Sequence, residues 1–188
     1  MKSFFFVLLL LASQSLALAK TDLDLGSPAS ATPYDPYMSP VKLVLNHLTR
    51  LANDQNAMDR VRHLMHQGRQ FRYSFTSPYV AATPAVTAAT RAGDCKAKAL
   101  WLASKMDTRN VRFVIGKASL ERSANHAWLI WEGPQGWLIL DATMLSRPLS
   151  PDRTSPSDYV PSYSYSPTGK YAHAVVAAAA SKKYSDHL

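Results

Sequence analysis

The only cysteine of the sequence, Cys95, lies where its chemistry would favour nucleophilic attack. Asp94, directly before it, is a typical helix N-cap, and the apolar spacing that follows predicts a helix over residues 95–106. In the first turn of such a helix, unpaired backbone N–H groups and the positive end of the helix dipole stabilise a thiolate. The thiolate is the nucleophilic form of cysteine, so this position is the first candidate for a reactive site.

A thiolate nucleophile works with a histidine that transfers protons and with a carboxylate or amide that orients the histidine. The sequence supplies both in a predicted hairpin, whose strands cover residues 126–132 and 137–143. His126 begins the first strand, and Asp141 lies near the end of the second. These two side chains are therefore the candidate partners of Cys95.

The length of the hairpin loop decides whether His126 and Asp141 meet. A two-residue loop, Gly133-Pro134, would place them opposite each other, whereas a four-residue loop over 133–136 shifts the register by two and makes them diagonal neighbours. Both lengths keep the two side chains on one face, because strand faces alternate with a period of two. A loop with an odd number of residues would place them on opposite faces and exclude the contact.

The N-terminal residues predict export. Lys2 precedes an apolar run from Phe4 to Ala12, and Ala17-Leu18-Ala19 forms a small-x-small cleavage signal. This pattern is typical of a secretory signal peptide over residues 1–19, cut after Ala19, and the run is too short to span a bilayer. The mature chain is expected to be periplasmic or secreted, with no integral membrane segment.

Export bears on the state of the lone thiol. Exported proteins often use cysteines in disulfide pairs, but Cys95 has no partner in its own chain. The residue alone leaves three interpretations: a buried inert thiol, an intermolecular disulfide, or a reactive thiol. The predicted N-cap and the predicted His126–Asp141 pair favour the reactive thiol.

The composition is that of one globular domain. Of the 188 residues, 47% are hydrophobic and 18% are charged, which suits a packed core. The formal charge of +8 comes without a dense Lys/Arg run or a nucleic-acid-binding motif, so no nucleic-acid partner is expected. Residues 20–39 are rich in Pro, Ser, Ala and Tyr and predict a flexible lead-in, followed by a single domain over residues 40–188.

Hydrophobic periodicity predicts the other elements. Apolar residues at helical spacing indicate two helices, near 40–52 and 55–67, and Gly68 is expected to end the second. The remaining expected elements are a strand over 71–75, a connection over 76–92, a strand over 111–118, a further strand within 158–166 and a helix over 171–183.

Other nucleophiles and ligands have weaker support. Ser123 and Ser146 lie near the hairpin residues in sequence, but neither occupies a Gly-x-Ser-x-Gly elbow. His63 and His66 are one helical turn apart and could contact a metal, but they lack a third ligand, which favours a solvated helix face. The sequence identifies no partner for the remaining histidines, His47 and His173.

Three segments together resemble the bacterial transglutaminase-like cysteine hydrolases. They are "RAGDCKAKALWLASKM", "NVRFVIGKA" and "NHAWLIWEGPQGWLILDAT", and they occur in the family's order. The upstream "RVRHLMHQGRQFRYSFTSPYVAATP" also resembles the approach to the cysteine in these proteins. The similarity covers about residues 58 to 143 and is specific for the superfamily, whereas it does not identify a substrate.

The resemblance implies a papain-like α+β fold, with the nucleophile at the N-terminus of a helix that packs on an antiparallel sheet. Cys95 would attack an amide carbonyl, His126 would act as general base and then as general acid, and Asp141 would orient His126. The backbone N–H of Cys95 would be one oxyanion donor. Tyr73 and Tyr79 are the candidates for a second donor.

The sequence departs from the family directly after the cysteine. The calcium-binding periplasmic proteinases of this group have acidic residues there, whereas Lys96-Ala97-Lys98 follow in this chain. Ammonium groups cannot ligate Ca²⁺, so we expect no metal at this position and no cofactor. Lys96 and Lys98 either strengthen the thiolate or simply lie exposed.

The function that follows is an exported cysteine peptidase or amidase, which acts through a thioester on a protein or a cell-wall peptide. A transglutaminase-type acyl transferase that joins Gln to amines would use the same residues, with an amine in place of water. A non-catalytic binding module is the third hypothesis, and the presence of all three triad candidates argues against it. The sequence does not indicate the scissile bond, a regulatory partner or the oligomeric state.

Overall fold

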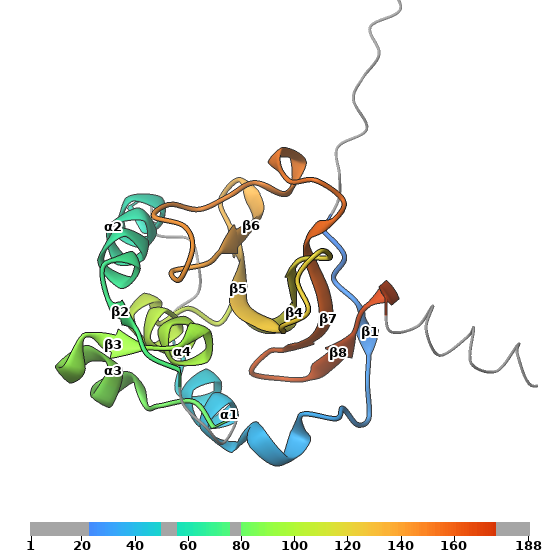
Figure 1. The fold of residues 1–188 in the computed structure, drawn as a ribbon, viewed down its shortest axis with the longest axis horizontal. Helices are drawn as coiled ribbons and strands as arrows, with labels where there is room; N and C mark the ends of the chain where they lie inside the picture. The colour runs from blue at the N-terminus through green and yellow to red at the C-terminus, as the bar shows by residue number, and fades with distance from the viewer. Residues whose placement is uncertain (1–22, 50–55, 76–79, 176–188) are drawn as a thin grey trace, which may run out of the picture.

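The computed structural model describes residues 23–49, 56–75 and 80–175, which contain a six-stranded sheet (Figure 1). Every neighbouring pair of strands in it is antiparallel. The strands predicted over 111–118, 126–132 and 158–166 are confirmed, whereas the strand predicted over 137–143 ends at Leu140, so Asp141 directly follows it. In the order in which they neighbour each other, the strands are β1 (Ser27–Pro28), β8 (Lys170–Ala172), β7 (Asp158–Tyr165), β4 (Val111–Ser119), β5 (His126–Gly133) and β6 (Gly136–Leu140).

Four helices gather beside this sheet (Figure 1): α1 (Ser39–Asn46), α2 (Ala57–Arg69), α3 (Pro84–Thr90) and α4 (Cys95–Met106). The innermost is α4, which contacts the other three helices and β5. Almost all of its side chains are buried, as expected for a helix that has apolar residues on every side. The predicted helix over 95–106 and the α+β fold class, with this helix packed on an antiparallel sheet, are confirmed.

Gly68 lies inside α2, so the prediction that it ends this helix is wrong. A Cβ at this position would lie 2.9 Å from the Cβ of Ala142 and 2.9 Å from a ring carbon of Trp101. The missing side chain therefore lets α2 approach both α4 and the segment that follows β6. Because Ala142 is the neighbour of Asp141, this close packing also supports the predicted site.

The connection expected over 76–92 contains structure of its own. Residues 84–90 form α3, and β3 (Ala92–Gly93) pairs in parallel with β2 (Arg72–Tyr73), which is shorter than the strand predicted over 71–75. The side chain of Thr83 caps α3 by accepting a hydrogen bond from the backbone of Val86 at 3.3 Å, and Pro84 follows at the first helical position. A threonine cap and a proline start, followed by an alanine-rich run, are the helix signals in this segment.

The hydrophobic core has two parts, because adjacent strand residues point to opposite faces of the sheet. The larger part joins the helices to the sheet and contains Trp101, Phe113 and Leu129. The smaller part contains Val114 and Trp128, which are the sequence neighbours of the last two. The sheet is thus covered on both faces along β4 and β5.

Residues 23–39 belong to the folded structure, so the prediction of a flexible lead-in is wrong for them. Leu23 and Leu25 pack against the smaller part of the core, and β1 pairs with β8. Asp35–Tyr37 form a 3₁₀ helix that leads into α1. Prolines and serines are common in linkers, but they are also common in edge strands and turns. In this structure they lie in the edge strand β1 and in the turns that follow it.

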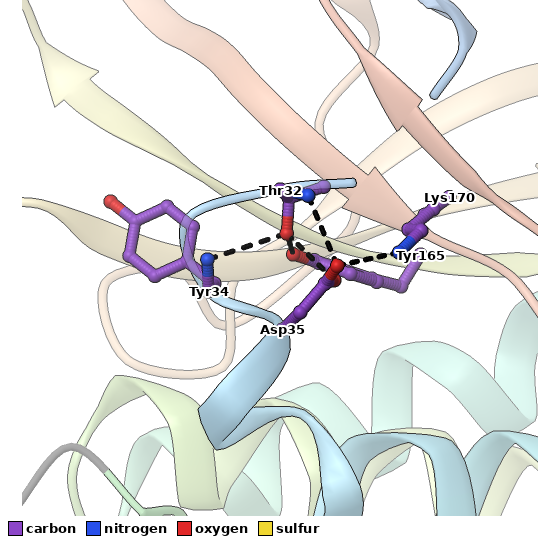
Figure 2. Close-up of polar contacts among 5 residues, drawn as sticks. All are labelled: Thr32, Tyr34, Asp35, Tyr165 and Lys170. Atoms are coloured by element: carbon purple, nitrogen blue, oxygen red, sulfur yellow. Dashed lines mark hydrogen bonds and ion pairs between the residues drawn. The ribbon is translucent and has the colours of Figure 1, made fainter. Parts of the chain in front are cut away.

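A polar network ties this N-terminal segment to the far end of β7 and to β8 (Figure 2). The hydroxyl groups of Thr32 and Tyr165 are hydrogen-bonded, and Thr32 also donates to the Asp35 carboxylate at 2.9 Å. Lys170 donates to the other Asp35 oxygen at 2.6 Å. The hydrogen bond from Lys170 holds the pKa of Asp35 below its usual value, and the bonds from Thr32 add to this effect against an opposing contribution from burial.

The helix predicted over 171–183 is wrong at its start, because Tyr171 and Ala172 belong to β8. Pairing with β7 overrides the helical preference of this alanine-containing segment. Residues 176–183 and the predicted signal peptide, residues 1–19, lie outside the described residues. Within the described ranges, none of the helices has the length and apolar character needed to cross a membrane.

We expect Thr32→Val to lower the free energy of unfolding by about 1–3 kcal/mol, because the buried Tyr165 hydroxyl and the Asp35 carboxylate both lose a partner. Valine preserves the size of the side chain, so urea denaturation measures mainly the missing hydroxyl. Thr168→Val, at an exposed position, is the control and should change stability by less than about 0.5 kcal/mol. Equal effects of the two variants would show that the network does not hold the segment.

Candidate active site

The predicted N-cap at the start of α4 is present. The Asp94 side chain accepts a hydrogen bond from the backbone N–H of Ala97 at 3.0 Å, and α4 begins at Cys95. As the first residue of the helix, Cys95 has a backbone N–H without an acceptor in the preceding turn. This N–H group is therefore oriented for a ligand or substrate oxygen near the thiol.

His126 and Asp141 are in contact, as predicted. The Nε2 atom of His126 lies 2.8 Å from Oδ2 of Asp141. The strands pair Glu132 with Trp137, which is the register predicted for the four-residue loop, and the register of a Gly133-Pro134 loop is wrong. Gly133 and Gly136 also pair, so only residues 134 and 135 connect the strands. The two residues are consequently diagonal neighbours on one face, and the even register is what brings them together.

Asp141 is a fully buried carboxylate whose two oxygens accept hydrogen bonds from four groups. Only 1% of the residue is exposed. Oδ1 accepts from the backbone N–H groups of Thr143 at 2.9 Å and Met144 at 3.2 Å. Oδ2 lies between Nε2 of His126 and the hydroxyl of Tyr159, which donates at 3.1 Å. The sequence interpretation missed Tyr159, which lies in a Tyr-rich segment with no spacing relation to the hairpin.

The surroundings of His126 favour its charged form. Burial lowers the pKa of the imidazole, but hydrogen bonds with Asp141 and Cys95 and the charges of these groups outweigh burial and raise the pKa to about 9. Since Nε2 is bonded to Asp141, the ring nitrogen left for Cys95 is Nδ1. The structure thus brings all three predicted triad residues together around one imidazole.

Cys95 is less accessible than a reactive thiol at the protein surface would be. Only 8% of the residue is exposed, and it packs against the larger part of the core. Burial alone would suit the inert interpretation, and it disfavours an intermolecular disulfide. The contact with His126 distinguishes the site from an inert core position, because a core thiol has no need of a basic partner.

Of the two candidates for a second oxyanion donor, the structure describes Tyr73. Its side chain is half exposed, and its pKa is raised by partial burial first and then by the charges of Cys95 and Asp94 and a hydrogen bond with Cys95. The phenol therefore lies within reach of the thiol. The other candidate, Tyr79, falls outside the described residues.

Both lysines after the cysteine are buried, so the expectation that they simply lie exposed is wrong. Lys96 forms an ion pair with Asp94, and its ammonium group lies 5.4 Å from the ring centre of Phe75. Lys98 donates to the backbone oxygen of Phe71 at 2.6 Å. The two cations are held next to Cys95 by specific partners, which keeps their charge in a region that excludes water.

Lys98 also links α4 to the Asp141 carboxylate by electrostatics. Burial lowers the pKa of Lys98, the nearby charge of Arg69 lowers it further, and the Asp141 carboxylate opposes both effects. Lys98 lies one helical turn after Cys95. The positive charge of Lys98 therefore acts on the Asp141 carboxylate.

The remaining candidates have other surroundings. His63 and His66 are exposed on α2, which agrees with a solvated helix face, and His66 lies 3.0 Å from the amide nitrogen of Gln70. Ser123 and Ser146 are both exposed, while the ring of His126 is engaged by Asp141 and Cys95. Among the residues described, no group of three or more His, Cys, Asp or Glu side chains could hold a metal ion.

The sequence identifies no partner for His47 or His173, whereas the structure shows one for each. The Nδ1 atom of His47 lies 2.6 Å from the backbone oxygen of Leu43 in α1. His173 is fully buried, with Nε2 at 2.9 Å from the hydroxyl of Ser164. Both contacts are local, and they have no connection with the triad.

Known structures with similar folds include that of LapG from Legionella pneumophila. It superposes with a TM-score of 0.51 and 19% sequence identity over 69% of this chain and 74% of LapG. The EGTA-treated form of LapG gives 0.52 and 19%, over 71% of this chain and 74% of that one. At this level of identity, the similarity shows a shared fold. No protein-family model and no curated protein matches the sequence.

The titration of His126 provides a direct test of this geometry. We expect an NMR midpoint of about 9 for its imidazole, and Asp141→Asn should move the midpoint down towards 6.5 by removing the carboxylate charge. Because the pKa is raised in the folded state, this group stabilises the fold fully below about pH 6.5, and the contribution is lost as the pH rises through 9.

The corresponding stability measurement is urea denaturation at pH 6 and pH 9.5. Asp141→Asn should weaken the loss of stability between the two, whereas the exposed His63→Gln should leave that loss unchanged. A His126 midpoint near 6.5 in the unmodified protein would contradict the charged imidazole.

Proposed function

We propose that the protein is an exported cysteine peptidase or amidase, with Cys95 as nucleophile, His126 as general base and acid, and Asp141 as the residue that orients His126. The observation that carries this proposal is an imidazole that is hydrogen-bonded to a buried carboxylate through Nε2 and interacts electrostatically with the Cys95 thiol. The cysteine-protease-like fold supports it. Export rests on the predicted signal peptide over residues 1–19.

In the first half of the reaction, the Cys95 sulfur attacks the carbonyl carbon of the substrate amide. A carbon–sulfur bond forms, and the π electrons of the carbonyl move onto its oxygen. As the tetrahedral intermediate collapses, the carbon–nitrogen bond breaks, and the leaving amine takes a proton from Nδ1 of His126. The product of this half is a thioester on Cys95.

In the second half, water replaces the amine. His126, now neutral, takes a proton from water, and the resulting hydroxide oxygen bonds to the thioester carbon. The carbon–sulfur bond then breaks and returns the thiolate and the imidazolium. The sum of both halves is hydrolysis of one amide to an acid and an amine, with the enzyme unchanged.

The developing oxyanion requires donors near the thiol. The backbone N–H of Cys95 has no acceptor in a preceding helical turn, and it points from the positive end of α4. The Tyr73 hydroxyl, which interacts with the thiol, is the candidate for a second donor. Donors that are fixed before the reaction stabilise the intermediate without reorganisation.

The proposed substrate is a protein or a cell-wall peptide. Tyr73 and Phe75 are both exposed, and they lie in the segment that reaches Cys95 and Lys96. Exposed aromatic side chains beside a nucleophile favour a substrate with an apolar residue near the scissile bond. Transfer to an amine in place of water would give the acyl transferase, and product analysis with and without an added amine distinguishes the two.

We expect Cys95→Ala to remove nearly all turnover, on the order of 10⁴-fold or more, because it deletes the nucleophile. His126→Ala should be similarly severe, and Asp141→Asn milder, up to about 10⁴-fold, since an amide can still orient the imidazole. The assay follows release of p-nitrophenolate from p-nitrophenyl acetate and of amines from a peptide library. Ser123→Ala and Ser146→Ala are controls that should keep full activity.

Circular dichroism must show that each of these variants is folded. Alanine at the first turn of α4 is a good helix former, so Cys95→Ala should cost little stability. A Cys95→Ala protein with unchanged turnover would contradict the enzyme, and one that keeps its biological effect would identify a binding module.

We also expect activity without calcium, because the ammonium group of Lys96 is paired with the Asp94 carboxylate beside the nucleophile. Because the charge of the buried Asp94 carboxylate is already neutralised by Lys96, this carboxylate is a poor ligand for Ca²⁺. The measurement is the rate of p-nitrophenyl acetate turnover after EGTA treatment, with and without added Ca²⁺. Loss of turnover in EGTA and its recovery with Ca²⁺ would refute this assignment of Lys96.

A further inference from the structure

Among the residues that the structure describes, Tyr159 is the only one whose hydroxyl group forms a hydrogen bond with the Asp141 carboxylate. It lies on β7, far from the hairpin in sequence, and it is buried. We propose that Tyr159 is a positioning residue: its hydroxyl shares Oδ2 of Asp141 with His126 and thereby moderates the pull of the carboxylate on the imidazolium proton. This inference rests on the proposed function, and it adds a residue to the same site.

The backbone of Tyr159 adopts an unusual conformation to reach this position. Its φ angle is +50°, in the left-handed region that residues with a Cβ rarely adopt. Such a conformation persists only where the surrounding contacts require it, and these cases concentrate at functional sites. The strained backbone and the hydrogen bond to the triad carboxylate occur at the same residue.

A close approach of β7 to β4 makes this conformation possible. Gly116 of β4 pairs with His126 on one side and with Pro161 on the other. A Cβ at Gly116 would lie only 2.2 Å from the backbone oxygen of Val160 and 2.9 Å from the Trp128 ring. Any larger residue would push β7 away from the strand that carries His126, and Tyr159 would move with it.

Tyr159 also reaches His126 through an aromatic contact. Its ring meets that of Trp128 edge-to-face, with centroids 5.5 Å apart. The Trp128 ring in turn stacks near-parallel with His126, at 6.1 Å. The phenol therefore fixes the carboxylate by a hydrogen bond and supports the imidazole by packing, so its two ends act on the two members of one pair.

The charges around Tyr159 keep its hydroxyl protonated. Burial raises its pKa most, the Asp141 charge and hydrogen bond raise it further, Asp158 adds to this, and only Arg122 opposes it. Tyr159 is consequently a hydrogen-bond donor throughout the working pH range. The groups that face His126 are Asp141 and Cys95. A donor on Oδ2 withdraws negative charge from the oxygen that holds the imidazolium.

This sharing has a consequence for the second half of the reaction. Attack by water needs neutral His126, and once Cys95 is a thioester the Asp141 carboxylate is the charged group that favours a proton on the imidazole. Without the Tyr159 hydroxyl, the carboxylate would act on the imidazolium alone, and the neutral fraction would decrease. Tyr159 therefore keeps His126 available as a general base.

Tyr159→Phe tests the inference by removing the hydroxyl and keeping the ring on Trp128. We expect the NMR midpoint of His126 to rise by about one pH unit. The steady-state kcat for p-nitrophenyl acetate at pH 7 should fall about tenfold with an unchanged kcat/KM, because only hydrolysis of the thioester is slowed. The alkaline shift should also appear in the pH–rate profile. A purely structural tyrosine would move neither midpoint nor profile.

Tyr165→Phe is the matched control. It removes another buried hydroxyl from the same strand, at a position whose partner is Thr32 rather than Asp141. It should cost stability and leave the His126 midpoint in place. A second variant carries 3,5-difluorotyrosine at position 159, which retains the fold and donates more strongly, so the midpoint of His126 should fall.

A His126 midpoint that is unchanged or lower in Tyr159→Phe, or that moves equally in Tyr165→Phe, overturns the inference. If Tyr159→Phe does not fold, the difluorotyrosine protein decides, and an unchanged or raised midpoint then overturns the inference. The titration needs no turnover. Absence of any Cys95-dependent activity in the unmodified protein would refute the proposed function, and the titration would still decide the role of Tyr159.

Discussion

A carboxylate that is buried to 1% exposure must receive enough hydrogen bonds to replace the water it has lost, and Asp141 meets this requirement from three separate parts of the chain. Its own turn supplies two backbone N–H groups, β5 supplies His126, and β7 supplies Tyr159. The start of β5, the residues after β6 and the start of β7 must therefore lie close together, and the strand order β7-β4-β5-β6 allows this.

The Cys95 side of the site obeys the same constraint. Asp94 is fully buried at the start of α4, where it caps the helix and pairs with Lys96, and Lys98 is buried one turn further on. Burying these charges costs free energy that a pair recovers only with good geometry, so they are weak evidence of stability. They are better understood as fixed positive charges that, with the helix N-terminus, would stabilise a developing oxyanion next to Cys95.

Sequence periodicity predicted what local rules determine. The N-cap at Asp94 and the shared face of His126 and Asp141 follow from residue type and from the period of two in strands, and both are present. The long-range features were not predictable in this way. At Gly68, inside α2, the missing side chain makes room for Trp101 and Ala142, which belong to other parts of the fold. Tyr159 reaches Asp141 through strand pairing that no sequence spacing indicates.

β7 shows why a tyrosine-rich strand could not be assigned from its pattern. In a regular strand, Tyr159 and Tyr165 would point to the same face, because they are six residues apart. Here Gly116 pairs with Pro161 while the preceding Ile115 pairs with Tyr163, so β7 has one extra residue at this point. Such a bulge reverses the facing of everything beyond it. Tyr159 therefore joins the smaller part of the core beside Asp141, and Tyr165 joins the larger part, where it binds the N-terminal segment through Thr32. One irregular position thus lets a single strand support the Asp141 carboxylate on one face and hold the N-terminal segment on the other.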